Sequence, residues 1–370
     1  MTSNNDKKVL NVPVLRFPEF SGEWKKYKLS DVCSFYSGGT PPSSKKEYYN
    51  GDIPFIRSGE LHKNKTELFI TEEGLNNSAA KLVETGDLLL ALYGATSGDI
   101  AISKIKGAIN QAILCIKTKQ NKKFIESAWN KHVERLLQTY LQGGQGNLSA
   151  DIVKNIAFYF ANSEEQDKLA RFISLLDERI ATQNKIIDKL QSLIRGIAQN
   201  ITCSNKPNVH ISECLECSSS TLQESDVFEH GAYPVYGANG IVGYFDDYST
   251  EDEAVHIIKD GSGVGTVSYV TGKCSATGTL NTLQAKDGYL LQYLYYMLKV
   301  FNFEPYKTGM AIPHIYFKDY GKAKIFCPSY TEQLKYVELL SAIDNKLSVE
   351  QRILTNLSLQ KQYLLRQMLI

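Results

Sequence analysis

The sequence predicts an α+β protein in which two globular mixed α/β domains are separated by two long helices forming an antiparallel coiled coil, as a pseudo-two-fold internal repeat. Two observations predict this fold class. An apolar heptad pattern occurs twice, starting at Leu169 and again at Tyr336. Short β-prone runs between Gly-rich turns precede each copy. The expected parts are a first domain, a central helical region, a second domain and a C-terminal helical region, at residues 1–162, 163–206, 207–328 and 329–370.

The first heptad pattern alternates spacings of four and three residues and has one polar gap, at Gln183. This spacing is typical of a coiled-coil helix. The second pattern keeps the same register and has its own polar gap, at Glu350. A lone heptad helix would fit a homodimer, but two copies in one chain can pair with each other, most simply antiparallel. The seam residues that flank the two gaps are Leu176, Ile180, Ile187 and Leu190, and Ile343, Leu347, Leu354 and Leu357.

The repeat also includes the helix starts and parts of the globular domains. Residues 163–166 and 329–332 both fit a capping box, in which the Ser caps the helix and the fourth side chain reaches back to the Ser N–H. Gly51–Pro54 looks equivalent to Gly231–Pro234. Two glycine pairs also recur at the spacing that separates the two heptad patterns, 167 residues, which is called the repeat offset below. They are Gly94 with Gly261 and Gly98 with Gly265.

Hydrophobic patterns predict the main elements inside each domain. Short apolar runs predict strands near 53–56, 87–93, 112–116 and 254–258, and longer patterns predict helices near 122–140 and 288–300. The chain of 370 residues is 43% hydrophobic, which is enough for a buried core in each domain. No apolar stretch reaches the roughly 18 to 20 residues that span a bilayer, and the N-terminus lacks the apolar region of a signal peptide. We therefore expect a cytoplasmic protein, with its seven scattered cysteines reduced.

Charge differs between the two predicted domains. Residues 1–162 hold 21 Lys and Arg against 16 Asp and Glu, a net of +5, whereas residues 207–328 hold 8 against 14, a net of −6. A free-standing nucleic-acid binder usually has a basic surface, because neutralised phosphates supply most non-specific affinity. If this chain binds nucleic acid, we expect a partner to supply much of the positive charge.

Motifs for catalysis, metal binding or nucleotide binding are absent from the sequence. Gly261–Gly265 fits neither dinucleotide nor P-loop spacing, and a tight turn accounts for it better. Cys214 and Cys217 have zinc-ligand spacing but lack a second pair. The tetrapeptide typical of amino-methyltransferases is also missing. These observations favour a non-catalytic binding protein with no metal or cofactor of its own.

Polar loops are the remaining candidates for function, because their hydroxyls, amides and cations suit contacts to DNA phosphates and base edges. Arg57 follows an apolar strand and is the group that we expect to read guanine. The other candidates in the first domain are Gly39, Thr40, Ser43, Lys45, Ser58, His62, Lys63, Thr96, Ser97, Gln142, Gln145 and Asn147. Those in the second domain are Tyr236, Asn239, Ser262, Thr266, Lys307, Thr308 and His314.

These residues resemble a known family, the specificity (S) subunits of type I restriction–modification enzymes. Leu15–Phe20 with Trp24 is similar to the N-terminal signature of the family, as are Gly38–Pro41 and Tyr49–Phe55. The ends of both domains are similar to the junction between a target-recognition domain and the helical region that follows it. The resemblance covers essentially the whole chain, and it is specific because the motifs recur in the same order.

The resemblance implies that each domain is a target-recognition domain for one half of a bipartite, asymmetric DNA sequence, and that the helices set the gap between the halves. It implies that two methyltransferase (M) subunits dock on the helical regions and that motor-nuclease, or restriction (R), subunits join them. S-adenosylmethionine, ATP and Mg²⁺ would then bind to partner subunits. A coiled-coil scaffold or adaptor for protein partners is the alternative, but it leaves the two differing loop-rich domains without explanation.

The sequence also leads to two narrower predictions. The shared polar gap predicts that Gln183 and Glu350 lie near one another or contact partner subunits, and do not lie in a dry seam. The position of Arg57 predicts that Arg57→Ala weakens discrimination at one base of the first half-site by about 1–3 kcal/mol.

Overall fold

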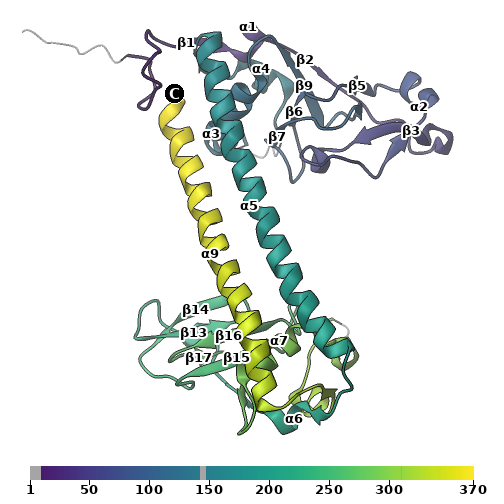
Figure 1. Ribbon diagram of the computed structural model, residues 1–370. Helices are drawn as coiled ribbons and strands as arrows, with labels where there is room; N and C mark the ends of the chain where they lie inside the picture. Colours follow the sequence, from purple (N-terminus) through teal and green to yellow (C-terminus); the bar gives the residue numbers. More distant parts are fainter. Residues whose placement is uncertain (1–9, 142–146, 310) are drawn as a thin grey trace, which may run out of the picture. The chain divides into compact units, whose positions relative to one another are not determined.

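The computed structural model describes residues 10–141, 147–309 and 311–370. It divides into two compact units (Figure 1). The first unit is the chain up to Thr182 together with Leu354–Ile370, and the second unit is Gln183–Ile353. The long helices α5 (Ser163–Cys203) and α9 (Tyr330–Met368) each contribute one part to each unit. No helix within the described ranges is long and apolar enough to cross a membrane.

The globular domain of the first unit, called the first domain below, contains an antiparallel sheet of order β2-β9-β6-β7 and a mixed sheet of order β4-β3-β8-β5, and β1 pairs with β10. The strands are β1 (Lys25–Lys28), β2 (Cys33–Ser37), β3 (Tyr49–Ile56), β4 (Phe69–Ile70), β5 (Lys81–Val83), β6 (Leu88–Ala91), β7 (Ile100–Ile102), β8 (Gly107–Ile109), β9 (Ile113–Thr118) and β10 (Ala157–Phe160). The helices are α1 (Leu29–Val32), α2 (Glu72–Asn76), α3 (Lys122–Leu141) and α4 (Ala150–Asn155), with 3₁₀ turns η1 (Lys46–Tyr48) and η2 (Ser58–Glu60).

Strand β6 lies at the centre of the core of the first domain. Leu88 and Leu90 belong to the cluster that includes α3, whereas Leu89 and Ala91 pack with residues of β3 and β8 in the other sheet. Both faces of the strand are therefore covered, which explains why its sequence is continuously apolar and does not alternate with polar residues.

The globular domain of the second unit, the second domain, contains an antiparallel sheet of order β12-β18-β15-β16 and a smaller sheet of order β14-β13-β17, and β11 pairs with β19. The strands are β11 (Val209–His210), β12 (Leu215–Ser219), β13 (Tyr233–Gly237), β14 (Gly240–Phe245), β15 (Glu253–Ile258), β16 (Val267–Thr271), β17 (Ser275–Ala276), β18 (Leu280–Ala285) and β19 (Lys324–Ile325). The helices are α6 (Ile211–Cys214), α7 (Leu291–Val300) and α8 (Phe317–Tyr320), with 3₁₀ turns η3 (Glu224–Asp226) and η4 (Glu304–Tyr306).

Strand registers confirm the predicted internal repeat. In the first domain Ser37 of β2 pairs with Leu114 of β9, and in the second domain Ser219 of β12 pairs with Asn281 of β18. The parallel pairing of β3 with β8 also recurs, as β13 with β17. The predicted strands and helices appear as β3, β6, β9, β15, α3 and α7. The two domains are therefore copies of one fold whose loops have diverged.

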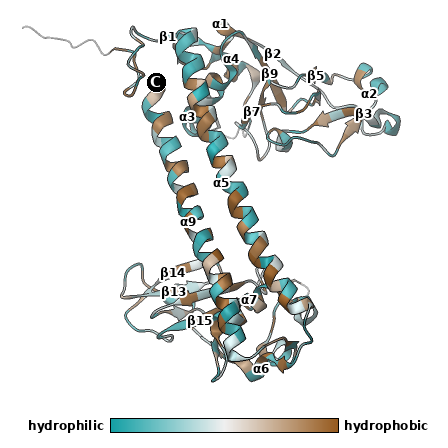
Figure 2. Ribbon diagram, in the orientation of Figure 1, coloured by the Kyte–Doolittle hydropathy of each residue, from teal (hydrophilic) through white to brown (hydrophobic). Residues whose placement is uncertain are grey.

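The long helices pair antiparallel inside each unit. In the first unit Asp177 of α5 forms an ion pair with Lys361 of α9. Leu169, near the start of α5, packs in the same cluster as Met368, the last residue of α9, so the two helices run in opposite directions. The seam residues are buried or half-buried, and Figure 2 shows apolar and polar residues alternating along both helices. In the second unit the Gln183 amide donates to the backbone oxygen of Glu350 at 3.0 Å and to its carboxylate. The two polar gaps therefore meet, as predicted, but both side chains are buried in the seam, contrary to the second part of the prediction.

The capping boxes predicted at both helix starts are wrong. Asn162, one residue earlier than expected, caps α5 by accepting a hydrogen bond from the N–H of Glu165. At α9 the Ser329 hydroxyl donates to the Glu332 carboxylate instead of capping a backbone N–H. Buried amides tie both helix starts to the domains: Gln166 donates to the Ala161 carbonyl, and Gln333 donates to the Pro328 carbonyl.

The N-terminal segment packs on the base of α5 in the first unit. The Arg16 guanidinium forms two hydrogen bonds of 2.7 Å with the carboxylate of Glu165. The Trp24 indole N–H donates to the same carboxylate. Phe17 meets Phe172 of α5 edge to face. The motif at Leu15–Phe20 is therefore a docking element that ties the start of the chain to the helical region.

Candidate nucleic-acid interface

Each domain has one loop with the same hydrogen-bonded backbone. The first glycine loop, residues 92–99, follows β6, and the second glycine loop, residues 259–266, follows β15. The N–H of Gly98 donates to the carbonyl of Ala91 at 2.9 Å, and the N–H of Gly265 donates to that of Ile258 at 2.9 Å. The matched glycines have φ values of +86° and +90° in the first loop, and +93° and +89° in the second. Only glycine adopts this conformation readily, which explains why these residues recur.

Polar side chains of the first domain gather beside the first glycine loop. The Thr40 hydroxyl donates to the Gln111 side-chain oxygen at 2.7 Å, and the Gln111 side chain also interacts with the Tyr93 hydroxyl, whose pKa it lowers. The Leu148 N–H bonds to the Leu92 carbonyl, which places Asn147 next to the loop. Burial raises the pKa of Tyr93 and keeps its hydroxyl neutral. Sequence reasoning found Thr40 and Asn147 but missed Tyr93 and Gln111.

In the second domain, Pro313 and His314 lie beside the second glycine loop. The Gly261 N–H donates to the Pro313 carbonyl at 3.0 Å. The His314 Nδ1 lies 2.6 Å from a carboxylate oxygen of Asp260. The predicted residues Ser262, Thr266, Thr308 and His314 therefore belong to neighbouring segments. Asp260 was missed, although it stands at the repeat offset from Tyr93.

The remaining candidates fall into several groups. Gly39 is buried, and a Cβ there would lie 2.5 Å from Ala79, so close packing requires glycine at this position. Lys45 forms an ion pair with Glu47, and Lys307 with Glu304. The Ser97 hydroxyl donates to the Leu92 carbonyl within its own loop. Gln142 and Gln145 lie outside the described residues. Ser43, Lys63 and Asn239 are exposed, and Ser58, Thr96 and Tyr236 are half-buried.

Arg57 forms ion pairs with two carboxylates of the first domain. Its guanidinium donates to both carboxylate oxygens of Glu60, at 3.3 and 2.9 Å, and also contacts Glu67. The Glu60 side chain is only 3% exposed. Burial raises the pKa of Glu60, but hydrogen bonds from Arg57 and Thr66 outweigh this effect and lower it to about 2. No observation of the structure tests whether Arg57 reads guanine, but the turn that follows the strand brings two carboxylates to its guanidinium.

We therefore expect Arg57→Ala to destabilise the first unit by about 1–3 kcal/mol at pH 7, because a buried carboxylate loses its charged partner. The depressed pKa of Glu60 means that this contribution is complete above about pH 4.5 and is lost as the pH falls toward 2. Urea unfolding at pH 7 and pH 3 measures the difference, with the exposed Lys63→Ala as the control. Unchanged stability together with altered choice of one base would contradict this role.

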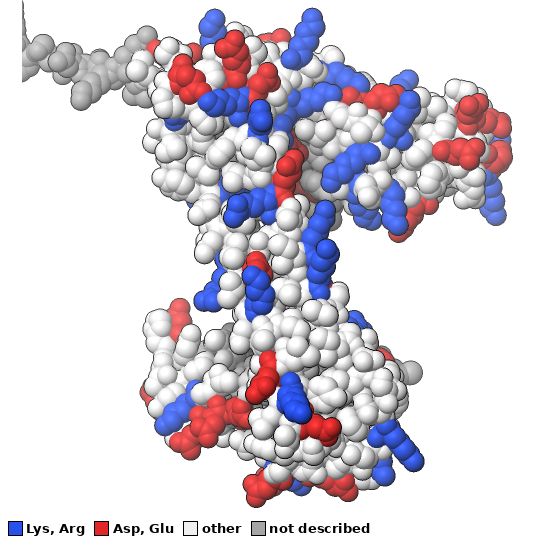
Figure 3. Space-filling view, in the orientation of Figure 1, with Lys and Arg blue, Asp and Glu red and all other residues white. Residues whose placement is uncertain are grey.

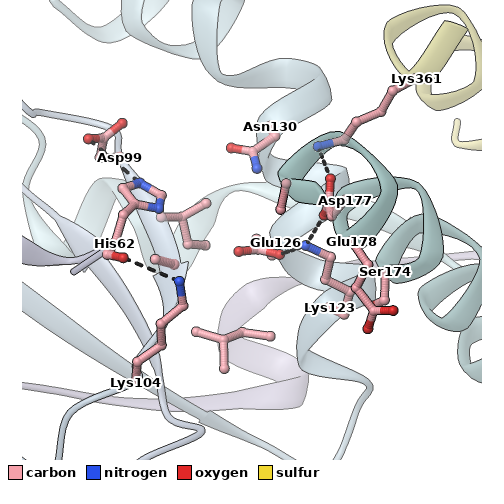
Figure 4. Close-up of a pocket in the computed structure, with 14 residues that line it drawn as sticks. His62, Asp99, Lys104, Lys123, Glu126, Asn130, Ser174, Asp177, Glu178 and Lys361 are labelled. Atoms are coloured by element: carbon pink, nitrogen blue, oxygen red, sulfur yellow. Dashed lines mark hydrogen bonds and ion pairs between the residues drawn. The ribbon is translucent and has the colours of Figure 1, made fainter. Parts of the chain in front are cut away.

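A polar cleft of about 570 Å³ lies between β7, α3 and α5 in the first unit (Figure 4). One wall carries an ion-pair network in which Asp177 accepts from Lys123 of α3 at 2.7 Å and from Lys361 of α9 at 2.5 Å. Burial raises the pKa of Asp177, but the two lysines hold it below its usual range. The opposite wall carries His62, 4.0 Å from Asp99. The charges are internally balanced, so the network serves to hold α3, α5 and α9 together.

Replacing Asp177 tests this role. We expect Asp177→Asn to lower the free energy of unfolding of the first unit by about 1–3 kcal/mol, because two half-buried lysines lose their common acceptor. Glu178→Gln is the matched control, since Glu178 is the exposed neighbour that lines the same cleft. Equal stability of the two variants in urea unfolding would show that the network contributes nothing.

The two domains differ in surface charge, as the composition predicts. Figure 3 shows Lys and Arg side chains spread over the first domain, whereas Asp and Glu are more prominent on the drawn face of the second. Among the described residues, no group of three or more His, Cys, Asp or Glu side chains could hold a metal ion. Burial raises the pKa of Cys217 to about 11, which disfavours the thiolate that zinc requires.

Comparisons with known proteins identify relatives of the chain. The EcoprrI specificity subunit of a type I restriction enzyme from Escherichia coli is 24% identical over 363 residues, which cover 87% of each chain. The MjaIX specificity subunit from Methanocaldococcus jannaschii is 27% identical over 182 residues, 45% of this chain and 42% of the relative. The fold matches the crystal structure of a type I restriction–modification S subunit from M. genitalium with a TM-score of 0.66 and 18% identity, over 97% of this chain and 99% of that one.

A family model described as the type I restriction modification DNA specificity domain matches residues 21–192 and again residues 209–359. The two matches together include most of the chain, one for each domain with the helix that follows it. The chain belongs to the family of type I restriction modification DNA specificity domains.

Proposed function

We propose that this chain is the DNA-recognition subunit of a type I restriction–modification complex, and that each domain reads one half of a bipartite, asymmetric site. One observation carries the proposal: the two domains share one backbone frame but present different side chains on it. The Thr40–Gln111–Tyr93 group of the first domain has no copy in the second, which presents Asp260 and His314. Two readers of the same shape and different chemistry suit two different half-sites.

The chain acts together with partner subunits in this proposal. Two methyltransferase subunits dock on the helical regions, and restriction subunits join them and are directed to the chosen site. Support comes from apolar side chains on α5 and α9 that face away from the seam, since exposed apolar residues along a helix are typical of binding surfaces. They include Leu175, Leu193, Leu339, Leu359 and Tyr363, each about half exposed. S-adenosylmethionine, ATP and Mg²⁺ bind to those partners, and the chemistry takes place there.

A gel-shift experiment tests the proposal. The chain, alone and with its methyltransferase partner, is added to a pool of random-sequence duplexes, and the bound DNA is sequenced. We expect the complex to enrich one bipartite sequence, and the chain alone to bind more weakly because its second domain is acidic. A complex that enriches no sequence would overturn the proposal and favour a protein-binding scaffold.

A further inference from the structure

Residues 93 and 260 occupy the same place in the two glycine loops. Residue 93 lies between Ala91, whose carbonyl accepts from the Gly98 N–H, and Gly94. Residue 260 lies between Ile258, whose carbonyl accepts from the Gly265 N–H, and Gly261. The N–H of Ala91 bonds to the carbonyl of Asp99 at 2.8 Å, and the N–H of Ile258 bonds to that of Thr266 at 3.0 Å. The backbone is therefore fixed at both positions, while the side chain differs: Tyr93 in one domain and Asp260 in the other.

A second segment of each domain supplies a partner to this side chain. Tyr93 interacts with Gln111, which lies in the turn between β8 and β9 and accepts a hydrogen bond from Thr40. Asp260 bonds to His314. In the second domain the residue equivalent to Gln111 is Gly278, whose N–H instead bonds to the backbone oxygen of Leu222. The backbone of the glycine loop is therefore repeated in the two domains, whereas the side chains that it presents differ.

The Asp260–His314 pair is not needed to hold its two segments together. Backbone hydrogen bonds from Gly261 to Pro313 and from Ile315 to Lys259, of 3.0 and 2.9 Å, already join them. Both side chains are 36% exposed. An ionised carboxylate is a pure acceptor, so the His314 Nδ1–H donates to one oxygen of Asp260 and orients the side chain. The other carboxylate oxygen can still accept a hydrogen bond from a ligand.

The charge of Asp260 restricts what that ligand can be. A carboxylate repels phosphate, so it is no contact for the DNA backbone. On the base edges of the major groove, the donors that it could accept from are the exocyclic amines, and carboxylates pair typically with N4 of cytosine. Gln111 carries an amide, which pairs with both N6 and N7 of adenine.

We infer that Gln111, beside Tyr93, and Asp260, paired with His314, are the base-reading residues of the two domains, the first directed at adenine and the second at cytosine. The inference rests on the proposed function and adds to it the two positions that determine the sequence. Thr40 and His314 are positioning residues, because they orient the groups that touch the bases.

Sequencing of DNA bound by the reconstituted complex tests the inference with Asp260→Asn and Gln111→Ala. Asparagine offers the donor and acceptor that adenine requires, so Asp260→Asn should change a preference for cytosine to one for adenine at one position of one half-site. Gln111→Ala should weaken the preference for adenine at one position of the other half-site. Each change should be about tenfold to a hundredfold at its own position, with the rest of the site unaltered.

Matched controls separate base reading from general effects. Asp287→Asn makes the same chemical change at an exposed residue beyond the far end of β18, and it should leave the selected sequence unchanged. Thermal unfolding should give the same midpoint for Asp260→Asn as for the wild type. If the wild-type complex selects no sequence, the proposed function fails. If the wild type selects a bipartite site and both variants select the same site, or lose affinity equally for all sequences, only the inference fails.

Discussion

Arg16→Ala should destabilise the first unit by about 3–5 kcal/mol, the largest loss that we expect from a single substitution. The Glu165 side chain is 1% exposed, and its carboxylate is neutralised by the Arg16 guanidinium through two hydrogen bonds of 2.7 Å. Removal of Arg16 leaves a buried carboxylate with the Trp24 N–H, a neutral donor, at 3.2 Å. The unpaired carboxylate destabilises the folded state by more than the ion pair stabilised it, because burial removes the water that would solvate the charge.

Tryptophan fluorescence during urea unfolding measures this loss selectively. The chain has two tryptophans, Trp24 and Trp129, and both are buried in the first unit. Arg171→Ala, an exposed arginine on α5, is the matched control and should change the stability little. The double variant Arg16→Met with Glu165→Leu should recover most of the loss, since it removes both charges. A loss for Arg16→Ala no larger than that for Arg171→Ala would contradict the role of the pair.

The second domain should lose stability in mild acid because of His256. The side chain of His256 is buried in β15, against the ring of Tyr236 at 5.6 Å. Neither ring nitrogen has a hydrogen-bond partner among the described residues. Burial lowers the pKa of His256 from 6.5 to about 4. Because the pKa is lower in the folded state, the stability is complete above about pH 6.5 and falls as the pH approaches 4, by about 2 kcal/mol at pH 5 and about 3 at pH 4.

His256→Leu should abolish this acid sensitivity. The equivalent residue of the first domain is Leu89, which is fully buried at the same place in its strand, so the fold accepts leucine there. Hydrogen exchange of the β15 and β18 amides at pH 7 and pH 5, corrected for the intrinsic rates, reports the stability of the second domain. The exposed His230→Leu is the control and should keep the wild-type response. An unchanged response in His256→Leu would mean that another group titrates.

The fold could be predicted from the sequence because its strongest signals are periodic. The heptad seam and the matched glycines recur at one spacing, so the sequence alone predicts the repeat. The meeting of Gln183 with Glu350 followed from the same offset. The helix starts were less predictable, since Asn162 and Ser163 are both good caps and a difference of one residue has little effect on the pattern.

The candidate site could be predicted only in part, because function there depends on which loops meet. The place of Arg57 after a strand predicts a DNA contact, but it does not show that the following turn brings the Glu60 carboxylate to its guanidinium. Gln111 was missed because nothing in its sequence neighbourhood shows that it lies beside Thr40, 71 residues earlier. A signal for Asp260 did exist, because it lies at the same spacing from Tyr93 as the matched glycines from one another, within backbone bonds that both glycine loops share.

Mapping of methylated adenines in the genome of cells that carry the complete system tests the central proposal most directly. Two unequal readers, one in each domain, predict that the modified adenines fall in a single bipartite motif with a fixed gap. The motif should disappear when the gene for this chain is deleted and the methyltransferase is retained. Modified adenines without a shared motif, or the same motif after the deletion, would contradict the proposal that this chain selects the DNA sequence.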